Sequence, residues 1–152
     1  MSNQRILLLQ SVQDRITDRR IWRIKNNPEL KDYTIENFYA IELSNSQREK
    51  DVDDMMMEVE TQGINEDDLL KRLDLKIQSF QPEVLIIHGG FVFRKFPKIF
   101  LKVLSKLKTK FPTIRFGLQG QEYLDFRIDV FPEFKKIFEK SFEMDILIKK
   151  IF

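Results

Sequence analysis

An apolar run that ends at the only histidine of the chain constrains the fold more than any other segment. Residues Val84–Ile87 are apolar, His88 follows them, and Gly89 and Gly90 come next. The run is too short for a helix and rich in β-branched side chains, so it predicts a buried strand of a parallel sheet. Two adjacent glycines then allow the backbone to turn sharply or to lie close to a bound group.

Patterns typical of strands and helices alternate along residues 1–152, which predicts a single α/β domain. The expected strands are Arg5–Gln10, Tyr33–Leu43, Val84–His88, Thr113–Leu118 and Met144–Ile151. Periodicity and capping residues predict helices at Arg15–Lys25, from Ser44–Ser46 to about Gly63, from Asn65 to about Phe80, at Phe96–Lys110 and along Phe131–Phe142. The expected architecture is a three-layer sandwich, with helices on both faces of a mostly parallel, five-stranded sheet.

The simplest arrangement of these elements is the flavodoxin-like strand order 2-1-3-4-5. A Rossmann-like variant, with fewer regular elements around residues 121–131, is the alternative. Lys149 and Lys150 at the end of the last expected strand indicate a sheet edge or an exit to solvent.

The residue counts exclude several kinds of site. The chain has no Cys, so it has no disulfide, no thiolate zinc site and no cysteine nucleophile. Its single His excludes a cluster of histidine metal ligands, and no motif indicates a cofactor. No apolar stretch approaches the roughly 18 residues that a membrane-spanning helix needs, and the N-terminus lacks a signal-peptide core. We therefore expect a cytoplasmic protein that makes no use of a membrane.

One acidic cluster, formed by Asp51, Asp53, Asp54 and Glu58, offers the oxygen ligands that Mg²⁺ and Ca²⁺ prefer. Its spacing does not match a calcium-binding loop. We expect a solvated helix face there and no bound metal.

The carboxyl ends of the central strands form the expected binding site. In open α/β sheets, ligands bind at the switch point of the strand order, which here falls between the first and third strands. The ligand-binding residues predicted at this edge are Ser11, Asp14, Arg15, Gly89, Gly90, Arg94 and Gln119. Arginine side chains and helix N-termini make such a crevice positive, so we expect an anionic small molecule such as a nucleotide or phosphoester. Glycines that merely terminate strands are the plainer alternative.

His88 is the candidate catalytic residue, because an imidazole can act as a general acid or base near neutral pH. The sequence places no acidic residue to orient it, and Asp14 becomes a candidate only through the assumed topology. The alternative is a histidine that donates one hydrogen bond to a carbonyl. The segment around Ser11 lacks the glycines of a nucleophile elbow, and neither a phosphate-binding loop nor a dinucleotide fingerprint is present.

Acidic and basic residues are segregated along the chain, although the net charge is only +2. Residues 84–121 contain no acid, whereas Glu42–Asp68 is strongly acidic. In the basic segment, Lys98, Lys102 and Lys106 form a candidate partner surface for nucleic acid or an acidic protein. A second basic group comprises Arg15, Arg19, Arg20, Arg23 and Lys25. The opposing blocks also permit a homo-oligomer, and a solvated lysine face is the plain alternative.

The order of elements resembles that of response-regulator receiver domains at the level of the fold. That family has an acidic pair after strand one, a phosphoacceptor Asp after strand three, a hydroxyl residue after strand four and a Lys after strand five. The matching positions here hold Gln10 and Ser11, His88, Gln119 and Lys149. Only the lysine agrees, so the resemblance implies a protein-binding module without phosphoryl transfer.

These features favour a regulatory or binding domain that engages an anionic ligand or partner at the C-terminal edge of its sheet. The alternative is a small phosphoester hydrolase or nuclease that uses His88 as general acid or base, with Arg15 or Arg94 stabilising negative charge. A polar pocket around the imidazole would favour the enzyme, and burial among apolar side chains would exclude it.

Overall fold

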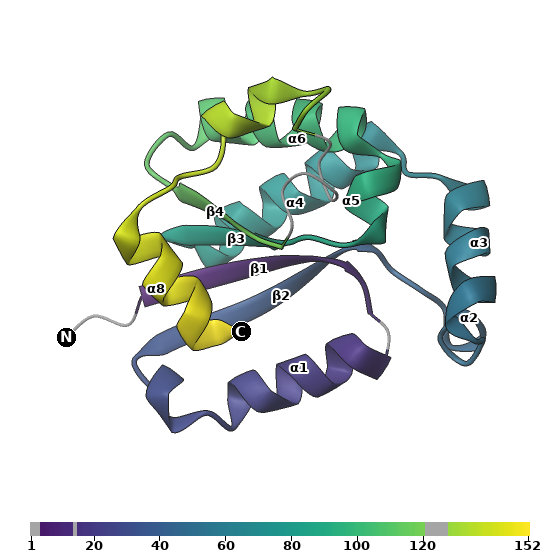
Figure 1. Ribbon diagram of the computed structural model, residues 1–152, viewed down its shortest axis with the longest axis horizontal. Helices are drawn as coiled ribbons and strands as arrows, with labels where there is room; N and C mark the ends of the chain where they lie inside the picture. The colour runs from purple at the N-terminus through teal and green to yellow at the C-terminus, as the bar shows by residue number, and fades with distance from the viewer. Residues whose placement is uncertain (1–3, 14, 121–127) are drawn as a thin grey trace.

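A parallel β-sheet forms the centre of the molecule (Figure 1). The computed structural model describes residues 4–13, 15–120 and 128–152, with the backbone alone at residues 15–17. The strands in this part of the chain are β1 (Gln4–Val12), β2 (Tyr33–Ile41), β3 (Val84–His88) and β4 (Arg115–Gln119). They are parallel and lie in the order β2-β1-β3-β4, which confirms an α/β fold with a parallel sheet.

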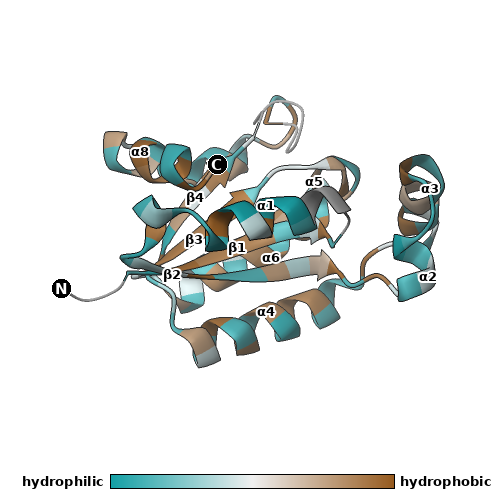
Figure 2. Cartoon of the chain, turned by 90° about the horizontal axis from the view of Figure 1, so that it is seen from below, coloured by the Kyte–Doolittle hydropathy of each residue, from teal (hydrophilic) through white to brown (hydrophobic). Residues whose placement is uncertain are grey.

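The two central strands are apolar on both sides because helices cover both faces of the sheet. Alternate side chains of a strand point to opposite faces. Leu7, Leu9 and their neighbours pack on one face under α4 (Glu66–Phe80) and α6 (Pro97–Lys110), and buried residues of α3 (Val52–Gln62) and α5 (Phe91–Lys95) belong to the same apolar cluster. Ile6 and Leu8 pack on the opposite face under α1 (Arg15–Lys25), the 3-10 turn η1 (Pro28–Leu30) and α8 (Phe142–Ile151). Figure 2 shows α1 and α8 on the side of the sheet opposite α4.

The expected fifth strand, Met144–Ile151, is wrong because this segment lies in the helix α8. The hydroxyl of Ser141 caps the helix by accepting a hydrogen bond of 3.2 Å from the backbone N–H of Met144. Met144, Leu147 and Ile151 follow helical spacing, and all three are buried against the sheet. Among the described residues the sheet therefore has four strands. Lys149, the one receiver-like match, is exposed on this helix and does not follow a strand.

Other predicted elements differ in detail. The phenylalanines Phe131–Phe142 do not lie on one helix, since η2 (Pro132–Lys136) is a short 3-10 turn and Phe142 already belongs to α8. The segment after Ser44 forms two helices, α2 (Asn45–Arg48), which Ser44 caps, and α3, which Asp51 caps. The helix α5 directly after Gly90 was not expected. The proposed irregular region 121–131 lies mostly outside the described residues, and residues 128–130 form a turn.

No helix in the described part of the chain is long and apolar enough to cross a membrane.

Candidate functional site

His88 lies at the carboxyl end of β3, half-buried, where the sequence predicted it. The parallel register places Leu9 of β1 beside Ile87, and Gln119 of β4 beside His88. The ends of β1, β3 and β4 therefore meet at one edge of the sheet. The backbone N–H of Gly89 donates a hydrogen bond of 2.6 Å to the carbonyl of Gln119, which ties the two loops together.

Gly90 lies against Ser11, near the end of β1. A Cβ atom at this position would lie 2.8 Å from Oγ of Ser11, which is closer than such atoms approach in proteins. Its φ of −172° is ordinary extended backbone, so space and not conformation requires glycine here. The predicted residues Ser11 and Gly90 are thus brought together, and the second glycine closes the gap between the ends of β1 and β3.

The side chain of Arg20, a residue of α1, contacts His88. Its Nη1 atom lies 3.0 Å from Nδ1 and 3.2 Å from Nε2 of the imidazole. An arginine can only donate hydrogen bonds, so the imidazole accepts through a nitrogen that carries no proton. The contact therefore requires the neutral form of His88.

An aromatic ring covers the imidazole. Phe152 stacks on His88 with ring centroids 4.9 Å apart and an angle of 11° between the planes. Burial, together with the positive charge of Arg20, lowers the pKa of His88 to about 4. At neutral pH the imidazole is uncharged, so it has no proton of low pKa to give to a leaving group. Its surroundings are mixed, with an apolar ring and a cation both in contact with it.

Sequence reasoning included Arg20 in a basic group but did not assign it to the site. The spacing of residues along α1 could have indicated its role. Arg20 precedes the buried Ile24 by four residues and so lies on the inward side of the helix. A charged side chain on the inward side of a helix needs a partner or a function. Among the described residues no carboxylate forms an ion pair with Arg20, and His88 leaves its charge uncompensated.

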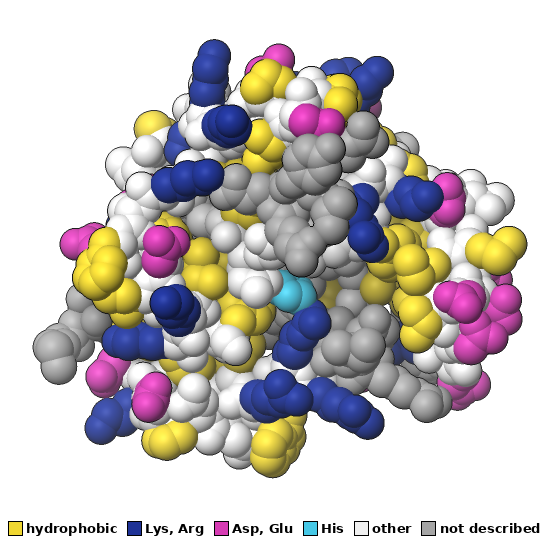
Figure 3. Space-filling view, viewed as in Figure 1, with side chains coloured by type: hydrophobic (Ala, Val, Ile, Leu, Met, Phe, Trp, Pro, Cys, Tyr) yellow, Lys and Arg dark blue, Asp and Glu magenta, His cyan; other side chains and the backbone are white. Residues whose placement is uncertain are grey.

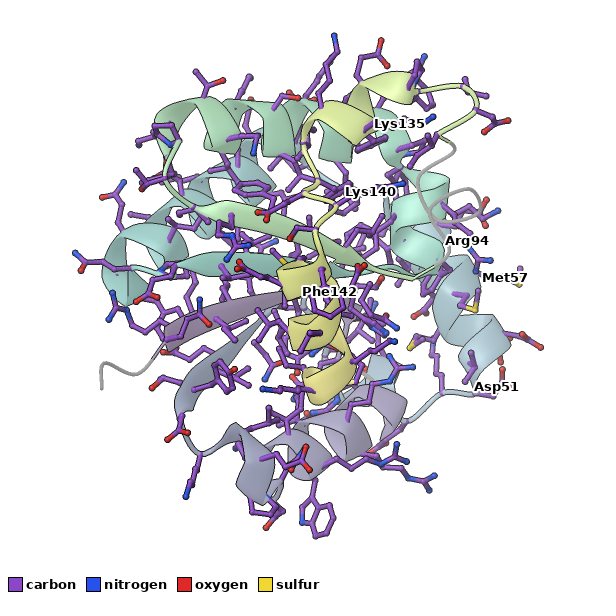
Figure 4. The ribbon with its side chains drawn as sticks, turned by 60° about the vertical axis from the view of Figure 1, so that its left-hand side comes forward. Asp51, Met57, Arg94, Lys135, Lys140 and Phe142 are labelled. Carbon is purple, nitrogen blue, oxygen red and sulfur yellow. The ribbon has the colours of Figure 1, made fainter. Side chains whose placement is uncertain are left out.

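The remaining predicted site residues lie in different places. Asp14 is outside the described residues, as is the side chain of Arg15. Arg94 is exposed on α5, on the side of the molecule that α3 and its Met57 occupy (Figure 4). No contact between Arg94 and His88 is seen. Arg20, and not Arg94, is thus the cation in contact with the imidazole.

Two polar atoms beside this edge have no hydrogen-bond partner in the described structure, Oε1 of Gln10 and Oγ of Ser11. Gln10 is only 2% exposed, and its amide nitrogen donates to Oδ1 of Asn37 on β2. Buried polar atoms without partners are uncommon in folded proteins. The end of β1 therefore holds two buried polar atoms without a partner among the described residues.

The predicted partner surface on α6 faces the acidic segment of the same chain. Lys102 and Lys106 lie 3.9 and 4.0 Å from the carboxylate of Glu66 in the first turn of α4. Lys98, on the same helix, is exposed. Lys95 and Lys110 pair with Glu60 and Asp74. Such exposed pairs stabilise the fold little, by up to about 1 kcal/mol each, but they partly neutralise both blocks.

The acidic cluster at the start of α3 has local structural roles. The carboxylate of Asp51 accepts a hydrogen bond of 3.0 Å from the N–H of Asp54, and Glu58 pairs with Lys50. Within the described part of the chain, no group of three or more potential ligands could hold a metal ion.

Comparisons of the chain with models of protein families, with curated proteins and with solved structures found no match. The function is therefore inferred from the geometry of the site.

Proposed function

We propose that the chain is a binding or regulatory domain that engages an anionic ligand or partner at the C-terminal edge of its sheet, through Arg20. The observation that supports this proposal is the contact between Arg20 and the neutral His88. An imidazole that accepts a hydrogen bond fixes the guanidinium without neutralising it. An arginine held in place in this way, with no ion pair among the described residues, is well suited to binding a phosphate or carboxylate group.

The position of this arginine in the fold supports the same conclusion. The strand order β2-β1-β3-β4 is that of the first four strands of a flavodoxin-like sheet. Its switch point lies between β1 and β3, where the hydroxyl of Ser11 lacks a partner among the described residues. Partial burial lowers the effective dielectric, which strengthens the attraction between Arg20 and an anion.

The neutral imidazole favours binding over phosphoester hydrolysis. A general acid must carry a proton at the working pH, and a pKa near 4 leaves His88 without one. As a base it would have to release the hydrogen bond from Arg20 first. No contact in the described structure supports hydrolysis as directly as the contact between Arg20 and His88 supports binding.

Replacing Arg20 with glutamine should weaken anion binding at this edge by about tenfold or more, since hydrogen bonds to charged groups contribute about 1.5–3 kcal/mol. The probes are inorganic phosphate, pyrophosphate and adenosine diphosphate, followed through the NMR signals of the single imidazole. Lys135→Gln is the control, because Lys135 is an exposed cation of η2 that belongs to neither proposed site. Equal affinities for the two variants, or no binding of any probe to the unmodified protein, would contradict the proposal.

A further inference from the structure

The outer face of α1 carries an exposed tryptophan between two arginines. Trp22, the only tryptophan of the chain, is 66% exposed. Arg19 and Arg23 are exposed as well and lie three residues before and one residue after it. Arg19 precedes Trp22 by three residues and Arg23 by four, so it neighbours both on the helix surface, and we call the side formed by these three residues the α1 outer face.

The arginines of the α1 outer face are available to a ligand. No ion pair in the described part of the chain involves Arg19 or Arg23, and the nearby acid Asp18 is held by Arg48 at 2.5 Å. Lys25, in the last turn of the helix, adds a further exposed cation. Figure 3 shows Lys and Arg side chains gathered along α1, beside the histidine. The helix therefore presents a strip of positive charge.

A cavity adjoins this strip. It has a volume of about 510 Å³, within the range of small-molecule sites, and opens between the end of α1, η1 and β2. Lys25, Asn26, Lys31 and Tyr33 are among its lining residues. Asn26 connects the cavity to the outer face, since its amide donates a hydrogen bond of 2.8 Å to the carbonyl of Trp22.

We propose that the α1 outer face binds single-stranded nucleic acid, with a base stacked on Trp22 and phosphates held by Arg19 and Arg23. An aromatic platform flanked by cations is the arrangement that proteins use to bind unpaired bases without sequence preference. Guanidinium groups suit phosphate because they donate two hydrogen bonds in one plane. The cavity offers space for a neighbouring base. This inference goes beyond the anion site at Arg20 and does not depend on it.

A flat anionic membrane fits this surface less well than a narrow strand. Helices that lie on a membrane insert a broad apolar face, whereas Trp22 is the only exposed apolar residue among the side chains of α1 that the structure describes. The helix α8, which covers the same face of the sheet, exposes Glu143 and Asp145 together with Lys149 and Lys150, so it adds no net positive charge that would extend the strip into a broad surface.

The single tryptophan makes the proposal directly measurable. Titration with an oligothymidine of about ten nucleotides should quench the fluorescence of Trp22, because stacking on a base changes the surroundings of the indole. Binding should weaken steeply with rising salt, as phosphate contacts release counterions. Anionic lipid vesicles serve as the competing probe. Absence of quenching by the oligonucleotide overturns the proposal, as does a vesicle-induced blue shift without any response to the oligonucleotide.

Substitutions test whether Trp22, Arg19 and Arg23 contact the nucleic acid. The affinity for a labelled oligonucleotide, measured by anisotropy, should fall about fivefold or more in Trp22→Ala and should be largely retained in Trp22→Phe. The double variant Arg19→Gln/Arg23→Gln should also bind weakly and should show a smaller dependence on salt. Lys102→Gln/Lys106→Gln is the matched control on the opposite layer, and Arg20→Gln tests independence from the anion site. Equal losses in the Lys102/Lys106 variant would overturn the assignment to α1. Circular dichroism checks that each variant is folded.

Discussion

Replacing Met144 with alanine should lower the free energy of unfolding by about 2–4 kcal/mol, as large-to-small substitutions in a core do. Met144 is only 1% exposed and packs α8 onto the sheet. Ile146→Ala is the matched control, because Ile146 is 39% exposed and should change the stability by less than about 1 kcal/mol. If this segment were a strand, residues 144 and 146 would share one face and respond alike. Urea denaturation followed by circular dichroism measures both values.

Met144 lies against Gly117 of β4, and substitutions at both positions test whether α8 packs over this strand. A methyl group at Gly117 would lie 2.5 Å from the sulfur of Met144, so Gly117→Ala alone should destabilise the protein by about 1–3 kcal/mol through overpacking. Removing the Met144 side chain makes room for that methyl group. The double variant should therefore lose about 1 kcal/mol less than the sum of the single losses. Additive losses would show that α8 does not lie over β4 as described.

The prediction of a strand at Met144–Ile151 was wrong for a physical reason. Ile146, Leu147 and Ile148 are consecutive apolar residues with two β-branched members, and such a run is compatible with either a strand or a helix. The deciding signals were outside the run, in the capping hydroxyl of Ser141 and the acids of the first turn. Tertiary packing completes the choice, since the helix covers a face of the sheet that a fifth strand would have left open.

The position of the candidate site was predictable from the sequence, but the side chains that contact His88 were not. Parallel strands end at a common edge, so His88, Gly90 and Ser11 could be placed together from the strand pattern alone. The contact of Arg20 with His88 depends on how α1 is rotated against the sheet. The stacking of Phe152 depends on α8 being a helix. A topology that ends in a strand could not predict the contact of Phe152 with the imidazole.

Acid should destabilise the protein through His88 between about pH 6.5 and pH 4. The pKa of His88 is about 4 in the folded protein and about 6.5 in the unfolded chain, so within this window the unfolded state binds more protons. The free energy of unfolding must then fall as the pH is lowered. A complete shift of this size is worth about 3 kcal/mol, and the partial exposure of the ring reduces the expected loss to about 2 kcal/mol.

The variant His88→Gln isolates this effect, because glutamine does not titrate and still offers an acceptor to Arg20. Its stability should fall less than that of the unmodified protein between pH 6.5 and pH 4, and the two should run parallel above pH 7. Since the chain has one histidine, its NMR signals report the pKa of His88 without assignment. Arg20→Gln should raise that pKa by removing the neighbouring charge, and Phe152→Ala should raise it by exposing the ring. An unshifted pKa near 6.5 would instead mean that the imidazole is charged in mild acid. It would then repel Arg20, and the fixed guanidinium on which anion binding rests would be lost.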